Sequence, residues 1–206
     1  MQRRVFDVLA SAGGLVLVVV LVVAGSLLMW AQSFTSSNVH SQLARQEIFF
    51  PSKEAFAHAK PGTEITPSMI PSVSQYAGQQ LLTGDQAEAY ANDFIAVHLS
   101  EMPYHGVYAT ISNAARVAAP GSAQAAKLNA LETTSFQGTT LRGLLLEAYA
   151  FGTFGAIALW AGVAAYALAA IMLFLVLLGF WHARRTPSDA EFLAASARVD
   201  KEPVTV

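Results

Sequence analysis

The sequence contains no cysteine and few charged residues. Among its 206 residues 13% are charged and 54% are apolar, whereas soluble globular domains carry roughly 25% charged residues. Without cysteine the chain forms no disulfide, thiolate metal site, thiol nucleophile or cysteine-linked lipid anchor. The low charge indicates that part of the chain lies outside water.

Long runs of one charge sign are also absent, and the formal net charge is −2. Proteins that bind nucleic acid usually carry a basic stripe, so we expect no nucleic-acid partner. The sequence further lacks the GxSxG nucleophile elbow, a glycine-rich phosphate loop and the HExxH metal motif. These absences favour a non-enzymatic protein without a cofactor.

An uncharged apolar run occupies residues 8–31. About 20 residues suffice for a helix to cross the hydrocarbon core. Arg3 and Arg4 before the run, with small residues at 24–26, also fit a cleaved signal peptide. The run continues past that point to Trp30, where an interfacial aromatic anchor belongs. The pattern therefore predicts an uncleaved transmembrane helix.

A second uncharged run extends over residues 148–181. As a single helix it would measure about 50 Å, longer than a hydrocarbon core of about 30 Å. Trp160 and Trp181 are spaced as anchors at the two interfaces. We therefore predict a second span over residues 158–181, preceded by a helical stalk.

The orientation follows from the arginines that flank the two spans. Arg3 and Arg4 precede the first span, and Arg184 and Arg185 follow the second. Basic residues near span ends favour the cytoplasmic side. The sequence thus predicts a plasma-membrane protein with a cytoplasmic N-terminus (1–7), a first span (8–31), an extracytoplasmic helical domain with membrane-proximal stalks (32–157), a second span (158–181) and a cytoplasmic tail (182–206).

Small residues recur on one face of the second span, at Ala158, Gly162, Ala165 and Ala169. Such a face lets another helix approach closely. It would pack against the first span or against a partner protein, or it reflects only the alanine content of membrane helices. Neither span contains an ionisable residue in its interior, which disfavours a pump or channel.

The central region has helical patterns and no comparable strand pattern, so the predicted class is all-α. Its clearest signal is a capping box formed by Thr83 and Gln86. The helix that follows should bury a face containing Tyr90 and Phe94, and should end near Met102 because proline follows.

Two more helices are predicted, over residues 107–118 and 122–136. In the second, Leu128, Leu131 and Phe136 form the expected buried side. Gly138 should end this helix, and Thr139 or Thr140 would cap another that enters the membrane. The expected arrangement is an antiparallel bundle.

His98, Glu101 and His105 are the residues with metal-ligand spacing. On one helical face, two imidazoles and a carboxylate could hold zinc or iron. Pro103 lies between the second and third ligand and is expected to end the helix there. In the alternative interpretation His98 is a half-buried packing residue, Glu101 is a surface acid and His105 belongs to a turn.

Four segments carry a resemblance to a known family: QRRVFDVLA at the start, YAGQQLLTGDQAEAYANDFIAVHL, TLRGLLLEAYAFG, and LLGFWHARR near the end. Together they cover most of the chain. The sequence resembles a family of actinobacterial two-span proteins, mostly called hypothetical membrane proteins. The resemblance implies an actinobacterial origin and two spans around an outer domain, and it transfers no catalytic residue.

Three functions from different classes agree with these observations. The leading hypothesis is an accessory or scaffold protein of the cell envelope, whose outer domain contacts the lipid bilayer, another membrane or envelope protein, or a second copy of itself. The second is an extracytoplasmic sensor or small-ligand module, which requires a pocket. The third is a metal-dependent enzyme that uses His98.

Overall fold

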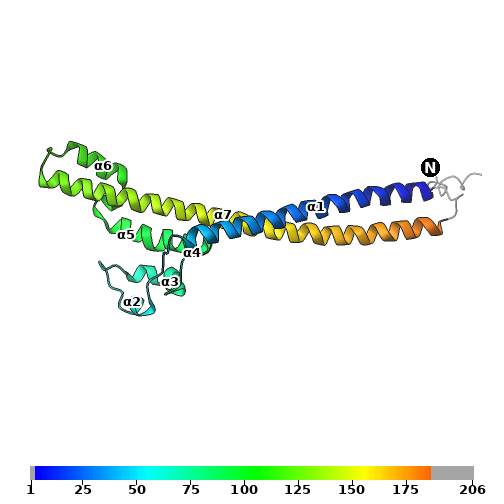
Figure 1. The fold of residues 1–206 in the computed structure, drawn as a ribbon, viewed down its shortest axis with the longest axis horizontal. Helices are drawn as coiled ribbons and strands as arrows, with labels where there is room; N and C mark the ends of the chain where they lie inside the picture. Colours follow the sequence, from blue (N-terminus) through cyan, green and yellow to red (C-terminus); the bar gives the residue numbers. More distant parts are fainter. Residues whose placement is uncertain (1–2, 187–206) are drawn as a thin grey trace, which may run out of the picture. The chain divides into compact units, whose positions relative to one another are not determined.

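The computed structural model describes residues 3–186. Within this range the chain is mostly helical, without a β-strand (Figure 1). Phe49 and Gln80 form an isolated antiparallel bridge. The all-α prediction is therefore confirmed for the described residues. Two helices, α1 (Arg3–Ala44) and α7 (Ala123–Arg185), are long and apolar enough to cross a membrane.

The described chain divides into two compact units. One contains residues 3–30 and 158–186, and the other contains residues 31–157. We call them the span unit and the central unit.

In the span unit, the first part of α1 packs antiparallel against the last part of α7. A Cβ placed on Gly25 would lie 3.3 Å from the Tyr166 ring, and one on Gly14 would lie 2.7 Å from Val176 Cγ2. On both helices, buried and half-buried residues include a series with steps of three and four residues, which is the spacing of a coiled-coil seam. The series contains Asp7, Ser11, Gly14, Val18, Leu21, Gly25 and Leu28 on α1, with Gly162, Ala165, Ala169, Met172, Val176, Gly179 and Ala183 on α7.

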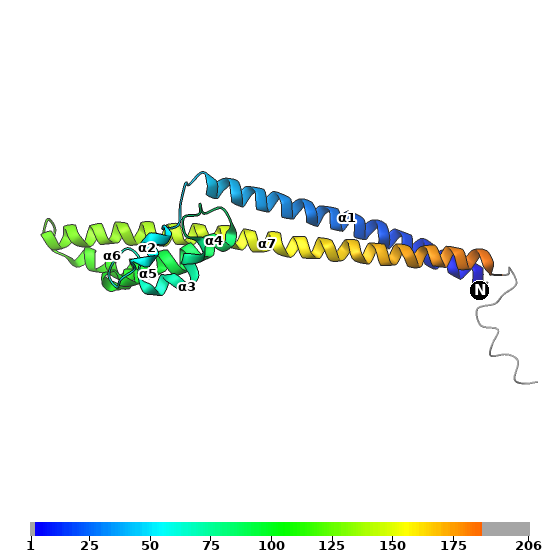
Figure 2. The ribbon, with the colours of Figure 1, turned by 90° about the horizontal axis from the view of Figure 1, so that it is seen from below.

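The central unit gathers short helices beside the amino-terminal part of α7 (Figure 2). Their order follows the chain: α2 (Lys53–Ala57), η1 (Pro67–Met69), α3 (Ile70–Val73), η2 (Ser74–Tyr76), α4 (Gly84–Ala89), η3 (Tyr90–Ile95), α5 (Ala96–Glu101), η4 (Pro103–Gly106) and α6 (Tyr108–Val117). The core contains large apolar side chains from most of these elements. Met69, Leu81, Ile111 and Leu145 are almost fully buried.

The strongest local prediction, the capping box, is present at the start of α4. The Thr83 hydroxyl accepts a hydrogen bond from the Gln86 backbone N–H at 3.3 Å, and the Gln86 side chain accepts one from the Thr83 N–H at 3.1 Å. The helical path continues through η3, a π-helical segment, and ends at Glu101 before Pro103. Both predicted ends of this helical region therefore agree with the structure to within a residue or two.

The predicted break at Gly138 is wrong, because α7 continues through it. A Cβ at Gly138 would lie 2.8 Å from Leu99 Cδ2. Gly138 thus permits α5 to approach α7 closely, and it does not terminate a helix. Phe136 is also not part of the buried side of α7: it is 57% exposed, whereas its neighbour Ser135 is fully buried.

Candidate binding surfaces

The structure separates the three residues with metal-ligand spacing. His98 lies in α5, Glu101 is the last residue of that helix, and Met102 has an extended backbone before Pro103. His105 lies in the following turn with φ +53°. Within residues 3–186 no group of three His, Asp or Glu side chains could hold a metal ion. For His98, Glu101 and His105, the physical reason is that α5 ends before Pro103, so His105 does not continue the helical face of the other two.

His98 packs as an aromatic side chain. Its Nδ1 lies 2.8 Å from the Phe94 carbonyl oxygen, and its ring centroid lies 4.6 Å from that of Phe94 in an edge-on arrangement. The row continues to Tyr90, 4.7 Å from Phe94, and to Phe50, 5.4 Å from Tyr90. The half-buried position and the exposed Glu101 agree with the packing interpretation of this segment.

The Tyr104–His105–Gly106 turn is left-handed at all three residues. Non-glycine residues rarely adopt this conformation, and it is strained unless the surroundings hold it. The Gly106 carbonyl accepts a 2.6 Å hydrogen bond from the buried Ser135 hydroxyl, and a Cβ at Gly106 would collide with the Leu99 carbonyl oxygen. The turn is therefore fixed against both α5 and α7.

Next to this turn, aromatic side chains are exposed. The ring centroids of Tyr108 in α6 and Phe136 in α7 are 5.8 Å apart, and both rings are more than 40% exposed. They line a shallow hollow of about 270 Å³ together with Glu132 and Thr133. We call these four residues the aromatic surface. Tyr and Phe are enriched at protein–protein interfaces, because they combine a large apolar area with few rotatable bonds.

A larger groove lies between the end of α1 and the middle of α7, entirely within the central unit. Its volume is about 370 Å³, within the range of roughly 300–1,000 Å³ that is typical of small-molecule sites. Apolar side chains form most of its wall, and three amides, one hydroxyl and one carboxylate complete it. We call it the stalk groove; its lining residues are Phe34, Thr35, Asn38, Val39, Gln42, Leu43, Gln46, Leu144, Glu147, Ala148 and Phe151.

The π-helical segment η3 positions a polar contact with α7. Arg142 Nη2 donates a 2.9 Å hydrogen bond to Asn92 Oδ1, and Arg142 Nε is buried without a partner among the described residues. In the same segment, burial raises the pKa of the Tyr90 hydroxyl above its ordinary value, and the Glu64 carboxylate adds to the rise. The hydrogen bond between Arg142 and Asn92 therefore joins α7 to η3 within the central unit.

The predicted small-residue face of the second span packs against the first within the span unit. Ala165 and Ala169 are buried, and a Cβ at Gly162 would meet Met29 Sδ at 3.1 Å. Ala158 is half-buried. The Ser26 and Tyr166 hydroxyls share a 2.9 Å hydrogen bond across the pair, which the sequence alone did not reveal.

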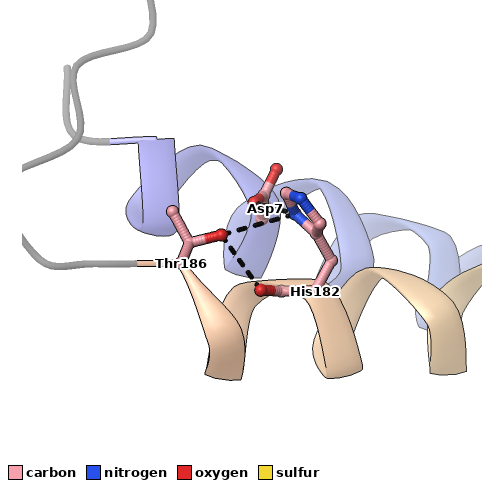
Figure 3. A network of polar contacts seen from close by, with 3 residues as sticks. All are labelled: Asp7, His182 and Thr186. Atoms are coloured by element: carbon pink, nitrogen blue, oxygen red, sulfur yellow. Dashed lines mark hydrogen bonds and ion pairs between the residues drawn. The ribbon is translucent and has the colours of Figure 1, made fainter.

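In the span unit, three polar side chains meet where the start of α1 lies beside the end of α7 (Figure 3). His182 Nδ1 lies 2.9 Å from Asp7 Oδ2, and the Thr186 hydroxyl donates a 3.0 Å hydrogen bond to the His182 carbonyl oxygen. Arg185 places its guanidinium 4.0 Å from the Trp181 ring centroid. This contact joins Trp181, a predicted interfacial anchor, to Arg185, a predicted cytoplasmic residue.

The remaining predicted interface residues lie mostly on the surface. Trp30 and Trp160 are 65% and 71% exposed, and Arg4 and Arg184 are also exposed. Arg3 is the first residue of α1. The predicted tail beyond Thr186 lies outside the described residues.

Comparison with protein-family models, with curated proteins and with solved structures found no match to this chain.

Proposed function

We propose that the chain is an integral membrane protein that spans the bilayer at residues 8–31 and 158–181. Only 17% of the most apolar window of α1 and 11% of that of α7 is buried. The core helix of a soluble protein would instead bury its apolar side chains. A surrounding bilayer would cover these helices, and a cleaved signal sequence would not account for α7.

In this proposal both ends lie in the cytoplasm and the central unit lies outside. The arginine pairs at the two span ends and the exposed Trp30, Trp160 and Trp181 support it. A reporter that works only outside the cytoplasm should be active when fused after Ala118 and inactive when fused after residue 206. The opposite pattern would place the central unit in the cytoplasm.

The function that the geometry favours is that of an accessory protein whose central unit binds another membrane or envelope protein. The aromatic surface carries this proposal. Tyr108 and Phe136 are exposed on adjoining helices, and the buried Ser135 hydroxyl holds the neighbouring turn in a strained conformation. A rigid, exposed aromatic pair beside a hollow is typical of an interface anchor.

A photo-crosslinking amino acid at Thr133, inside the hollow, tests this proposal in native membranes. One discrete protein adduct should form, and Phe136→Glu should abolish it because a carboxylate would be buried in the interface. Val117→Glu is the matched control, since Val117 is exposed on α6 and does not line the hollow. Two differently tagged copies would identify a homo-oligomer. Adduct formation that ignores Phe136→Glu would contradict the proposal.

The stalk groove favours a second function, a small-ligand module on the outer side of the membrane. A small-ligand module requires a pocket, and the stalk groove has a suitable volume and a lining of apolar and polar side chains. The class of ligand follows from where the groove lies along α1 and α7.

A further inference from the structure

The stalk groove has an apolar wall and a polar rim. Leu43 and Val39 at its base are buried, whereas Leu144 and Phe151 are 55% and 51% exposed. The amides of Asn38 and Gln42 lie four residues apart on one face of α1, and Gln46 follows just after the end of that helix at Ala44, so the three amides line the α1 side of the groove. Such a lining fits a long, thin apolar group that carries a hydrogen-bond acceptor.

In the sequence of each long helix, apolar residues lie between the groove residues and the predicted span. Along α1, Phe34 follows Trp30 by four residues, about 6 Å at the helical rise. Along α7, the exposed Phe151, Phe154 and Ile157 lead toward Trp160 at steps of three. If the two tryptophans mark the interface, the groove begins just outside the hydrocarbon core.

We propose that the stalk groove holds an acyl chain of a bilayer phospholipid. Outside the hydrocarbon core an empty groove exposes its apolar wall to water, which is unfavourable, and an acyl chain removes that wall from water. The amide N–H groups of the rim can donate hydrogen bonds to the ester carbonyl oxygens at the head of the chain. The bilayer supplies this ligand at high local concentration.

This proposal deepens the second candidate function, since it names the ligand class of the same groove, and it rests on the proposed membrane topology. It is independent of the aromatic surface. Loss of the protein adduct at Thr133 would leave the lipid site intact, and loss of lipid in the groove would leave the protein interface intact.

The test uses the full chain in phosphatidylcholine vesicles that contain a phospholipid with a diazirine on one acyl chain. Irradiation should label peptides that contain residues 34–46 and 144–151, in addition to the spans. Ala148→Phe and Leu144→Trp fill the groove and should reduce this labelling about tenfold, equivalent to about 1.4 kcal/mol. Leu144 is largely exposed, so its substitution should leave the fold intact; helicity measured by circular dichroism checks both variants.

Ala150→Phe is the matched control, because Ala150 lies two residues from Ala148 on α7, is exposed and does not line the groove. It should label as the unaltered chain does. Labelling confined to residues 8–31 and 158–181 would overturn the groove proposal while supporting the topology. Labelling by an added free fatty acid and not by the phospholipid would overturn the bilayer as the source. Equal labelling of the Ala148→Phe, Leu144→Trp and Ala150→Phe variants would also overturn it.

Discussion

The span unit and the central unit pack their helices in opposite ways. In the span unit the buried seam contains glycine and alanine, such as Gly25, Gly162 and Ala165, and the large apolar side chains are mostly exposed. In the central unit the buried positions hold large side chains, such as Met69 and Leu81. The same chain therefore follows two packing rules.

The difference teaches which solvent each unit is suited to. In water, burying large apolar side chains drives association, because it removes their surface from water. In a bilayer the lipid tails are as apolar as leucine, so helices gain mainly from close backbone approach. The exposed apolar side chains of the span unit would be unfavourable in water and favourable in lipid, which supports the proposal that this unit spans a bilayer.

The largest expected effect is the loss of a large core side chain in the central unit. Met69→Ala should destabilise this unit by about 2–5 kcal/mol, because it leaves a cavity at a fully buried position. Ile70→Ala, at the adjacent and 36% exposed position, should cost clearly less. Urea unfolding of the full chain in detergent, followed by hydrogen exchange of residues 50–117, measures both. Equal losses would show that the central unit lacks a packed core.

A smaller effect is expected when the small-residue seam is overfilled. Ala165→Leu should weaken helix pairing by about 1–3 kcal/mol, whereas Ala164→Leu adds the same volume at an exposed position and should have little effect. The two variants differ by one position in the helix. They therefore separate packing from composition.

Because the chain contains no cysteine, an engineered disulfide between the two helices can measure the effects of Ala165→Leu and Ala164→Leu. A Cβ at Gly179 would lie 3.5 Å from Ser11 Cβ, within the range of about 3.5–4.5 Å that a disulfide requires. The double variant Ser11→Cys, Gly179→Cys should thus form a disulfide when isolated membranes are oxidised. Ala165→Leu should reduce its yield and Ala164→Leu should not. No disulfide in the double variant itself would show that the spans do not pair in this register.

Local signals explain which parts of the fold could be predicted. The capping box at Thr83 and the helix end at Pro103 depend on neighbouring residues, so both were predicted correctly. The close approach at Gly138 involves Leu99, nearly forty residues earlier in the chain, and no local pattern reveals that contact. Contacts between residues far apart in the sequence are therefore the part of the fold that could not be predicted.

The candidate surfaces show the same limit. Spacing alone placed Phe136 on the buried side of α7, but that position is taken by Ser135, whose hydroxyl bonds to the Gly106 carbonyl oxygen. The stalk groove joins residues about 100 positions apart, so it could not be predicted from the sequence. The sequence did predict a small-residue face on residues 158–181, because Ala158, Gly162, Ala165 and Ala169 recur at steps of three and four.

A still smaller effect is expected at the hydrogen bond between the spans. Tyr166→Phe removes the hydroxyl that lies 2.9 Å from Ser26 Oγ, and interhelical hydrogen bonds in membranes contribute about 0.6 kcal/mol on average. A double-mutant cycle with Ser26→Ala isolates this contribution, with the engineered disulfide yield as the readout. A coupling above about 2 kcal/mol would mean that this polar contact, and not the small-residue seam, dominates pairing of the spans.

The smallest effect concerns the Tyr90 hydroxyl in the central unit, whose titration changes the stability of this unit only at alkaline pH. Because burial raises the pKa of Tyr90 in the folded state, its contribution to stability is fully present below the ordinary tyrosine pKa of about 10. It is lost as the pH rises through the folded-state pKa, because the unfolded chain releases the proton first. Tyr90→Phe keeps the ring in the aromatic row with Phe50 and Phe94 and removes the titration. Urea unfolding at pH 8 and above pH 10 should show a smaller alkaline loss of stability in this variant than in the unaltered chain. The same loss in both would mean that the hydroxyl is hydrated, and that the core of the central unit is less closed to water at its aromatic row than at Met69.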